Sequence, residues 1–131
     1  MPSKLRLQRI NDRIRQELSE MIVKQEIHDP RLAGISITEV SVDRELAYAE
    51  IYISAVEGSA RSKEVLAGME SASGFIRRML AERVDLRSFP RLRFHWDPTP
   101  ERAERIEQLL YSLRQEKPAA EPESSETDEE Q

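Results

Sequence analysis

The first 26 residues place their apolar side chains at helical spacing. Five of these side chains, separated by three or four residues, fall on one face of a helix predicted over residues 5–26. Pro30 in the motif "HDPR" disfavours helical geometry at Asp29, so the motif should end the helix, and Gly34 should complete the turn. The apolar stripe comprises Ile10, Ile14, Leu18, Met21 and Ile22.

Residues 35–55 change to the alternating pattern of a β-hairpin. In the first strand the two isoleucines have odd residue numbers and the two valines even ones, so a regular strand would place them on opposite faces. We therefore predict a β-bulge near Thr38–Glu39 that brings all four to the same face. A turn at 43–45 leads to a second strand with one apolar and one polar face. The pattern consists of Ile35, Ile37, Val40 and Val42 in the first strand, then Ala47, Ala49, Ile51 and Ile53 opposite Tyr48, Glu50 and Tyr52 in the second.

Two further helices are predicted between residues 59 and 84. Ser59 is the expected N-cap of the first helix. The small residues Ala72, Ser73 and Gly74 separate the two apolar stripes. These stripes are Val65, Leu66 and Met69 in the first helix, and Phe75, Ile76, Met79, Leu80 and Val84 in the second.

A third strand and a last helix complete the pattern. Leu92, Phe94 and Trp96 alternate with polar residues and should form the apolar face of the strand. Thr99 and Pro100 then match an N-cap and a first-turn proline. They open a helix predicted over about residues 99–115.

The element order αββααβ, with one helix appended, predicts an α+β fold. We expect a two-layer domain over residues 1–116, in which helices cover one face of a three-stranded sheet. Its core should combine Leu92, Phe94 and Trp96 with the alanine and isoleucine face of the second strand. Residues 117–131 should form a disordered acidic tail, because they include no large apolar side chain.

The composition argues against several classes of function. The 131-residue chain has no cysteine, which excludes disulfides and thiolate metal sites and fits a reducing compartment. It has no apolar run of the length of a signal peptide or a membrane span, so we expect a cytoplasmic protein. His28 and His95 have no second ligand at metal-site spacing, and phosphate-loop and nucleophile-elbow motifs are missing. We therefore expect no enzyme activity, no cofactor and no metal.

Charge is distributed unevenly along the chain. The net charge is −5, but residues from 118 onward hold six of the 25 acidic residues and none of the 20 basic ones. The tail is more simply explained as a solubilising segment than as a competitor for a basic surface. The remainder is close to neutral, yet residues 4–15 and 77–93 are rich in arginine. Two such stretches in a balanced domain predict a surface that faces a polyanion.

The segment Ala72-Ser73-Gly74 has two possible explanations. Glycine within a continuous helix would cost about 1 kcal/mol relative to alanine. Small residues allow two helices to cross closely. Alternatively, they form a helix–kink–helix turn whose exposed amides attract a phosphate. Arg77 and Arg78, in the first turn after the kink, oppose the helix dipole unless an anion lies nearby. The residues alone leave both explanations open.

Three runs resemble the ribosome-binding factor A family, which assembles the small ribosomal subunit in bacteria. They are "EIHDPRLAGISITEVSVDRELAYAEIYIS", "ASGFIRRML" and "LRSFPRLRFHWDPTPERAERIEQLL", in the order and spacing of that family over roughly residues 9–113. The resemblance implies a type II KH-like fold. It also implies that Ala72, Ser73 and Gly74 form the helix kink, in place of the GxxG loop of standard KH domains.

The resemblance implies a function in ribosome assembly. Members bind immature 30S subunits through 16S rRNA near the decoding region. The family is associated with late maturation, with processing of the 16S rRNA 5′ end and with growth at low temperature. A ribosome-associated GTPase releases these proteins. Independently of the resemblance, we expect a monomer, because the sequence shows no leftover apolar face, and we expect no membrane partner.

Five arginines are candidate RNA contacts, because each can neutralise a phosphate. For each, the alternative is a solvated or ion-paired surface residue. Arg31 should instead stabilise its own loop by pairing with Asp29 or with a helix C-terminus. Tyr48, Tyr52 and His95 fit cross-strand packing better than base stacking. The alternative function is a protein-interaction module without RNA contact. A third hypothesis, a sequence-specific binder of single-stranded RNA, is less well supported because the chain has no GxxG motif. The candidates are Arg9, Arg13, Arg77, Arg78 and Arg87.

Overall fold

The computed structural model describes residues 2–120, which form two compact units that meet at Pro98 and Thr99. The second unit is the helix α4 (Thr99–Ala120). It extends past the predicted end at 115. Residues 121–131 of the predicted tail lie outside the described residues, so the tail remains a prediction. No helix within residues 2–120 is long and apolar enough to cross a membrane.

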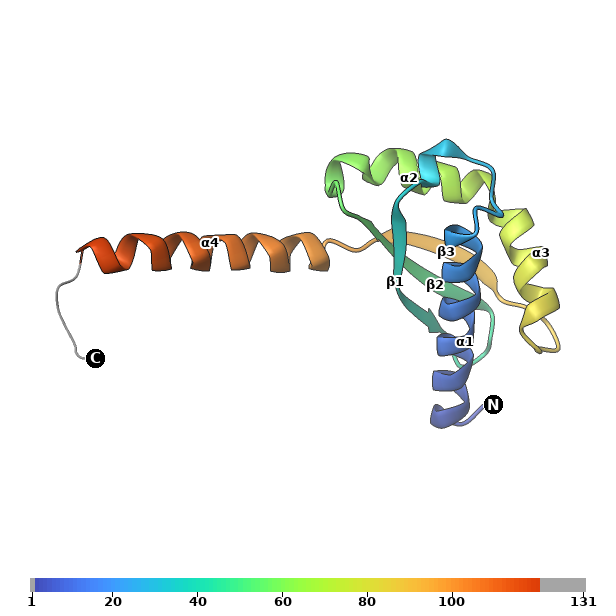
Figure 1. Cartoon of the computed structure of the whole chain (residues 1–131). Helices are drawn as coiled ribbons and strands as arrows, with labels where there is room; N and C mark the ends of the chain where they lie inside the picture. The colour runs from blue at the N-terminus through green and yellow to red at the C-terminus, as the bar shows by residue number, and fades with distance from the viewer. Residues whose placement is uncertain (1, 121–131) are drawn as a thin grey trace. The chain divides into compact units, whose positions relative to one another are not determined.

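The first unit has the predicted order αββααβ (Figure 1). Its three strands are β1 (Ile35–Val42), β2 (Tyr48–Ala55) and β3 (Arg91–Trp96). They lie in the order β1-β2-β3, with β2 antiparallel to β1 and parallel to β3. Two short 3₁₀ helices, η1 (Pro30–Leu32) and η2 (Ser59–Arg61), lie in the connections. The α-helices of this unit are α1 (Lys4–Val23), α2 (Ser62–Ser71) and α3 (Ser73–Arg83).

The core lies between the three helices and one face of the sheet, as predicted. Ala49, Ile51 and Ile53 of β2 are fully buried. The predicted β-bulge is confirmed, because the register of β1 against β2 shifts between Ile37 and Glu39. This shift lets both apolar pairs of β1 reach the core.

Two residues expected in the core are more exposed than predicted. Trp96 packs against the core but is only partly buried, because it is the last residue of β3. Ala47 precedes β2 and is exposed. Leu92 and Phe94 are buried as expected.

Helix α1 ends at Val23, three residues before the predicted end. Gln25 adopts a left-handed backbone conformation with φ of 57°. Pro30 therefore does not end the helix; a Schellman motif does. Its two hydrogen bonds run from the N–H of Gln25 to the Ile22 carbonyl (3.1 Å) and from the N–H of Glu26 to the Met21 carbonyl (3.0 Å).

The prediction that Ser59 caps the second helix is wrong. Gly58 has φ of 87°, and the N–H of Arg61 donates to the Gly58 carbonyl at 3.1 Å. Ser59 therefore begins η2, and Arg61 occupies the N-cap position of α2 without a side-chain capping hydrogen bond to the helix backbone. The left-handed glycine places a 3₁₀ turn where a direct helix start was expected.

Candidate nucleic-acid interface

A single residue, Ala72, connects α2 to α3. Its backbone lies at φ −91° and ψ 1°, and its N–H donates to the Gly68 carbonyl at 3.1 Å. The first backbone hydrogen bond of α3 runs from the N–H of Ile76 to the Ala72 carbonyl, at 2.9 Å. Ser73 and Gly74 occupy the first turn of α3, and no side chain caps this helix. The break between α2 and α3 thus falls at Ala72, within the segment 72–74.

The glycine that the fold needs for close packing is Gly68 rather than Gly74. A Cβ on Gly68 would lie 2.9 Å from the Leu32 side chain and 3.4 Å from Asp29 Oδ2. A Cβ on Gly74 would meet no heavy atom within 4 Å. Packing within the chain therefore explains why position 68 is a glycine, but it does not explain the glycine at position 74. The sequence signalled Gly68 only weakly, as one glycine in an apolar helical run.

The "HDPR" loop contains an internal ion pair, and its arginine also contacts α2. Arg31 Nη2 lies 2.7 Å from Asp29 Oδ2 and 3.5 Å from the Ser71 hydroxyl, near the end of α2. The Asp29 carboxylate also accepts the backbone N–H of Arg31 at 2.9 Å. These hydrogen bonds, from the Arg31 side chain first and its backbone second, lower the pKa of Asp29. The expected structural role of Arg31 is confirmed.

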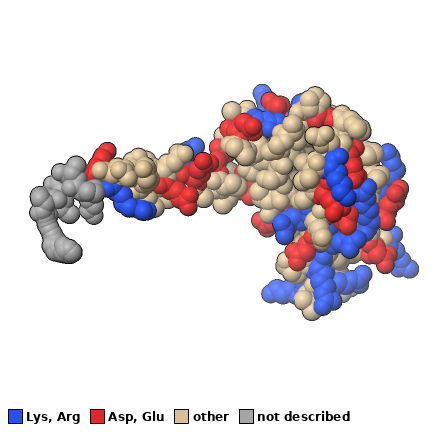
Figure 2. Space-filling view, viewed as in Figure 1, with Lys and Arg blue, Asp and Glu red and all other residues tan. Residues whose placement is uncertain are grey.

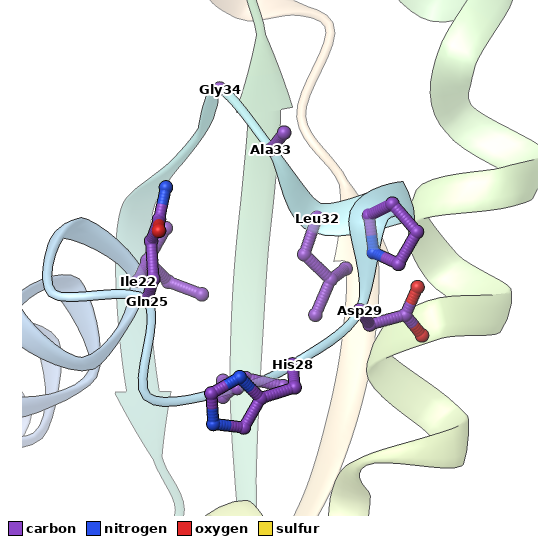
Figure 3. Close-up of a pocket in the computed structure, with 9 residues that line it drawn as sticks. Ile22, Gln25, His28, Asp29, Leu32, Ala33 and Gly34 are labelled. Atoms are coloured by element: carbon purple, nitrogen blue, oxygen red, sulfur yellow. The ribbon is translucent and has the colours of Figure 1, made fainter.

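The same loop surrounds a cavity of about 440 Å³ (Figure 3). The aliphatic side chains of Ile22 and Leu32 face this space, whereas the Asp29 carboxylate points toward the neighbouring helix. Gly34 closes the loop with φ of 74°, as predicted for the turn. The hydrogen bonds of Arg31 to Asp29 and Ser71 thus fix this loop beside the end of α2.

Two of the five candidate arginines have partners within the domain. Arg77 donates to the carbonyls of Phe89 (2.5 Å) and Pro90 (3.1 Å), immediately before β3. Arg13 lies 3.0 Å from Glu17 and donates to the carbonyl of Arg83, at 3.2 Å. Both guanidinium groups therefore hold neighbouring segments together, whatever else they contact.

The other three candidates are exposed and free of such partners within residues 2–120. Arg9 and Arg87 make no hydrogen bond or ion pair there, and Arg78 contacts the Phe75 ring at 5.8 Å from its centroid. The contact of Arg13 with the end of α3 brings α1 and α3 side by side. Figure 2 shows basic side chains gathered where α1 begins and along the side of the molecule where α3 lies, interleaved with acidic ones.

The face of the sheet away from the helices carries aromatic and charged groups that contact one another. The rings of Tyr52 and His95 stack with centroids 5.1 Å apart, and Arg93 lies 3.8 Å from the Tyr48 ring centroid. Glu50 pairs with His95 (2.6 Å) and Arg93 (2.7 Å). Burial alone would raise the pKa of Glu50, but hydrogen bonds from His95 and Arg93 lower it overall. The structure thus agrees with cross-strand packing.

A family model described as "Ribosome-binding factor A" matches residues 6–110. The chain belongs to the ribosome-binding factor A family. The ribosome-binding factor A of Alcanivorax borkumensis is 41% identical over 126 residues, which cover 93% of this chain and 89% of the relative. That of Aromatoleum aromaticum is 38% identical over 105 residues, which cover 80% and 82%.

A solved member of the ribosome-binding factor A family has the same fold. The crystal structure of ribosome-binding factor A from Thermus thermophilus aligns with a TM-score of 0.61 at 24% identity, over 69% of this chain and 93% of that one. The predicted α+β, KH-like fold is consistent with this likeness. The matching family model describes a ribosome-binding factor. Within residues 2–120, no cluster of three or more His, Asp or Glu residues is suited to a metal ion.

Proposed function

We propose that this chain is a ribosome assembly factor that binds immature 30S subunits through 16S rRNA and promotes their late maturation, including 16S rRNA 5′-end processing. Its family and the names of its relatives support ribosome binding. The observation that carries the RNA contact is the open kink. Gly74 has unoccupied space around it, no side chain caps the start of α3 there, and Arg78 follows one turn later.

The proposed contact works by neutralising phosphates and by shape. A phosphate can approach the backbone closely at Gly74, where a side chain would otherwise stand. Arg9, Arg78 and Arg87 are available for further phosphates, since none has an acidic partner within the described residues. Arg13 and Arg77 would then hold together the segments that carry these arginines, through their bonds to backbone carbonyls.

The wider role follows from the same proposal. The partner is the free small subunit, and a ribosome-associated GTPase would release the protein. A cytoplasmic location, a monomeric state and a contribution to growth at low temperature belong to this role. Each of them is a proposal carried by the family.

Co-sedimentation with purified immature 30S subunits tests the binding, with wild type, Arg78→Glu and Lys63→Glu at several salt concentrations. Lys63 is an exposed residue of α2 outside the kink and gives the matched reversal of charge. We expect wild type to bind with a steep salt dependence and Arg78→Glu to bind more weakly, with a log–log salt slope reduced by about one. Lys63→Glu should bind as wild type does. Binding that is indifferent to salt would instead favour a protein-interaction module.

A further inference from the structure

A second, smaller cavity lies directly beside the kink. Its volume is about 280 Å³, and it opens between the segment 26–29, which follows α1, and the segment 71–75 at the α2–α3 junction. We call it the kink cavity. Three of its lining residues are apolar, namely Ile27, Ala72 and Phe75, and the polar ones are Glu26, His28, Asp29 and Ser71. It shares only residues 27–29 with the larger cavity of Figure 3.

The lining of the kink cavity suits a flat, partly apolar group. Phe75 is half-buried, so part of its ring is fixed against the core and part is accessible. Ile27 and Ala72 add aliphatic surface, and the Ser71 hydroxyl can both donate and accept a hydrogen bond. Cavities that take whole small-molecule ligands usually measure about 300–1,000 Å³. The kink cavity is below that range, which suits one planar group of a larger ligand.

The position of the cavity indicates what that larger ligand is. Gly74, where the proposed phosphate contact lies, is two residues from Ala72 and one from Phe75. Arg78 lies over the Phe75 ring, so one cation borders both the phosphate site and the aromatic surface. A nucleotide held by its phosphate at Gly74 has its base within reach of the cavity. Stacking of bases on aromatic side chains and arginine is the usual way in which proteins hold unpaired RNA.

We propose that the kink cavity receives one unpaired RNA base, which stacks on Phe75 and whose edge hydrogen-bonds to Ser71. This inference rests on the proposed function and adds a base contact to its phosphate contacts. The base contact is uncharged, whereas the contact of Arg78 is ionic. The two are therefore separable by their dependence on salt.

Two substitutions remove the base contact without changing charge. Ala72→Leu fills the cavity, and Phe75→Leu removes the ring but keeps an apolar side chain against the core. In the 30S sedimentation assay, we expect both variants to bind about tenfold more weakly than wild type at every salt concentration, with an unchanged salt slope. Arg78→Glu is the control that lowers the slope. Circular dichroism and thermal unfolding establish that each variant is folded.

A second measurement uses the wild-type chain and does not depend on the folding of variants. Amide chemical shifts of ¹⁵N-labelled protein are followed during titration with adenosine 5′-monophosphate or with ribose 5-phosphate. We expect the nucleotide to shift the amides of residues 26–29 and 71–75. Ribose 5-phosphate, which has no base, should shift only those near Gly74.

The outcomes separate this inference from the proposed function. If wild type binds subunits and both leucine variants bind equally well, the base contact is wrong and the assembly function stands. If the variants lose affinity but the nucleotide leaves residues 26–29 unshifted, the cavity takes a protein side chain and the inference is overturned. If wild type does not bind subunits at any salt concentration, the proposed function fails, and this inference fails with it.

Discussion

Gly68 and Leu32 lie so close together that there is no room for a side chain at position 68. A Cβ on Gly68 would lie 2.9 Å from Leu32 Cδ2, and Leu32 is itself buried in the core. The contact holds Leu32, the residue after the "HDPR" motif, against α2. Residues of that motif line one side of the kink cavity. The geometry of the candidate site thus depends on a glycine outside the kink motif.

Gly68→Ala should destabilise the domain. The added methyl group must displace Leu32 or separate the loop from α2, and overpacking of this kind costs about 1–3 kcal/mol. Urea denaturation monitored by circular dichroism measures the difference in the free energy of unfolding. An alanine variant as stable as wild type would show that the loop moves aside without cost.

Gly74→Ala should have the opposite effect on stability and a harmful effect on binding. Its Cβ enters open space, and alanine in a helix is favoured over glycine by about 0.5–1 kcal/mol, so the free energy of unfolding should rise. The same methyl group should obstruct close approach of a phosphate and weaken 30S binding. Denaturation and co-sedimentation of one preparation test both effects. Unchanged binding by the more stable variant would remove Gly74 from the interface.

Arg77 and Arg78 are adjacent in sequence but should respond differently to alanine. Arg77→Ala leaves the buried residues Phe89 and Pro90 with unpaired carbonyls, which should cost about 1–3 kcal/mol of stability. Arg78→Ala removes an exposed guanidinium and should change stability by less than about 0.5 kcal/mol. Urea denaturation of the two variants separates these roles. An equal loss of stability in the two variants would contradict the assignment of Arg77 as the structural residue.

Glu50→Gln should destabilise the domain in a pH-dependent manner. The folded state lowers the pKa of Glu50, so its ionised form contributes stability above the unfolded-state pKa of about 4.3. That contribution is lost as the pH falls through the folded-state pKa. The deficit of the variant relative to wild type should therefore be full at pH 7 and shrink below about pH 4.

Urea denaturation at a series of pH values from 7 downward measures this deficit for Glu50→Gln. Glu45→Gln is the matched control, because Glu45 is exposed in the hairpin turn and has no ion pair within residues 2–120. A deficit at position 50 that stays constant with pH would mean that the pairing with Arg93 and His95 does not favour the charged carboxylate.

Periodicity was sufficient to predict the elements, because each apolar stripe reports the face that one element buries. The parity change before Val40 even located the bulge of β1. Contacts between distant segments were beyond this reasoning. The partners of Arg77 lie twelve and thirteen residues away and reach it only through the packing of α3 against the sheet. Likewise, the sequence does not tell which of Gly68 and Gly74 meets a neighbour.

The end of α1 shows why boundaries are harder to predict than elements. The Schellman motif there requires a left-handed residue, a position usually occupied by glycine, but this chain has Gln25. With no glycine to mark the position, the helix pattern continues in the sequence beyond the actual end at Val23. The proline of "HDPR" was then the nearest visible signal.

Gln25→Gly should therefore stabilise the protein. A left-handed conformation costs an ordinary L-residue about 1–2 kcal/mol, and glycine avoids that cost but loses more entropy on folding. We expect a net gain of about 0.5–1 kcal/mol, seen as a rise of a few degrees in Tm by differential scanning calorimetry. Gln25→Ala, which keeps the strained backbone, should give no gain. If alanine stabilises the domain as much as glycine does, the left-handed backbone at the end of α1 is not the source of the strain.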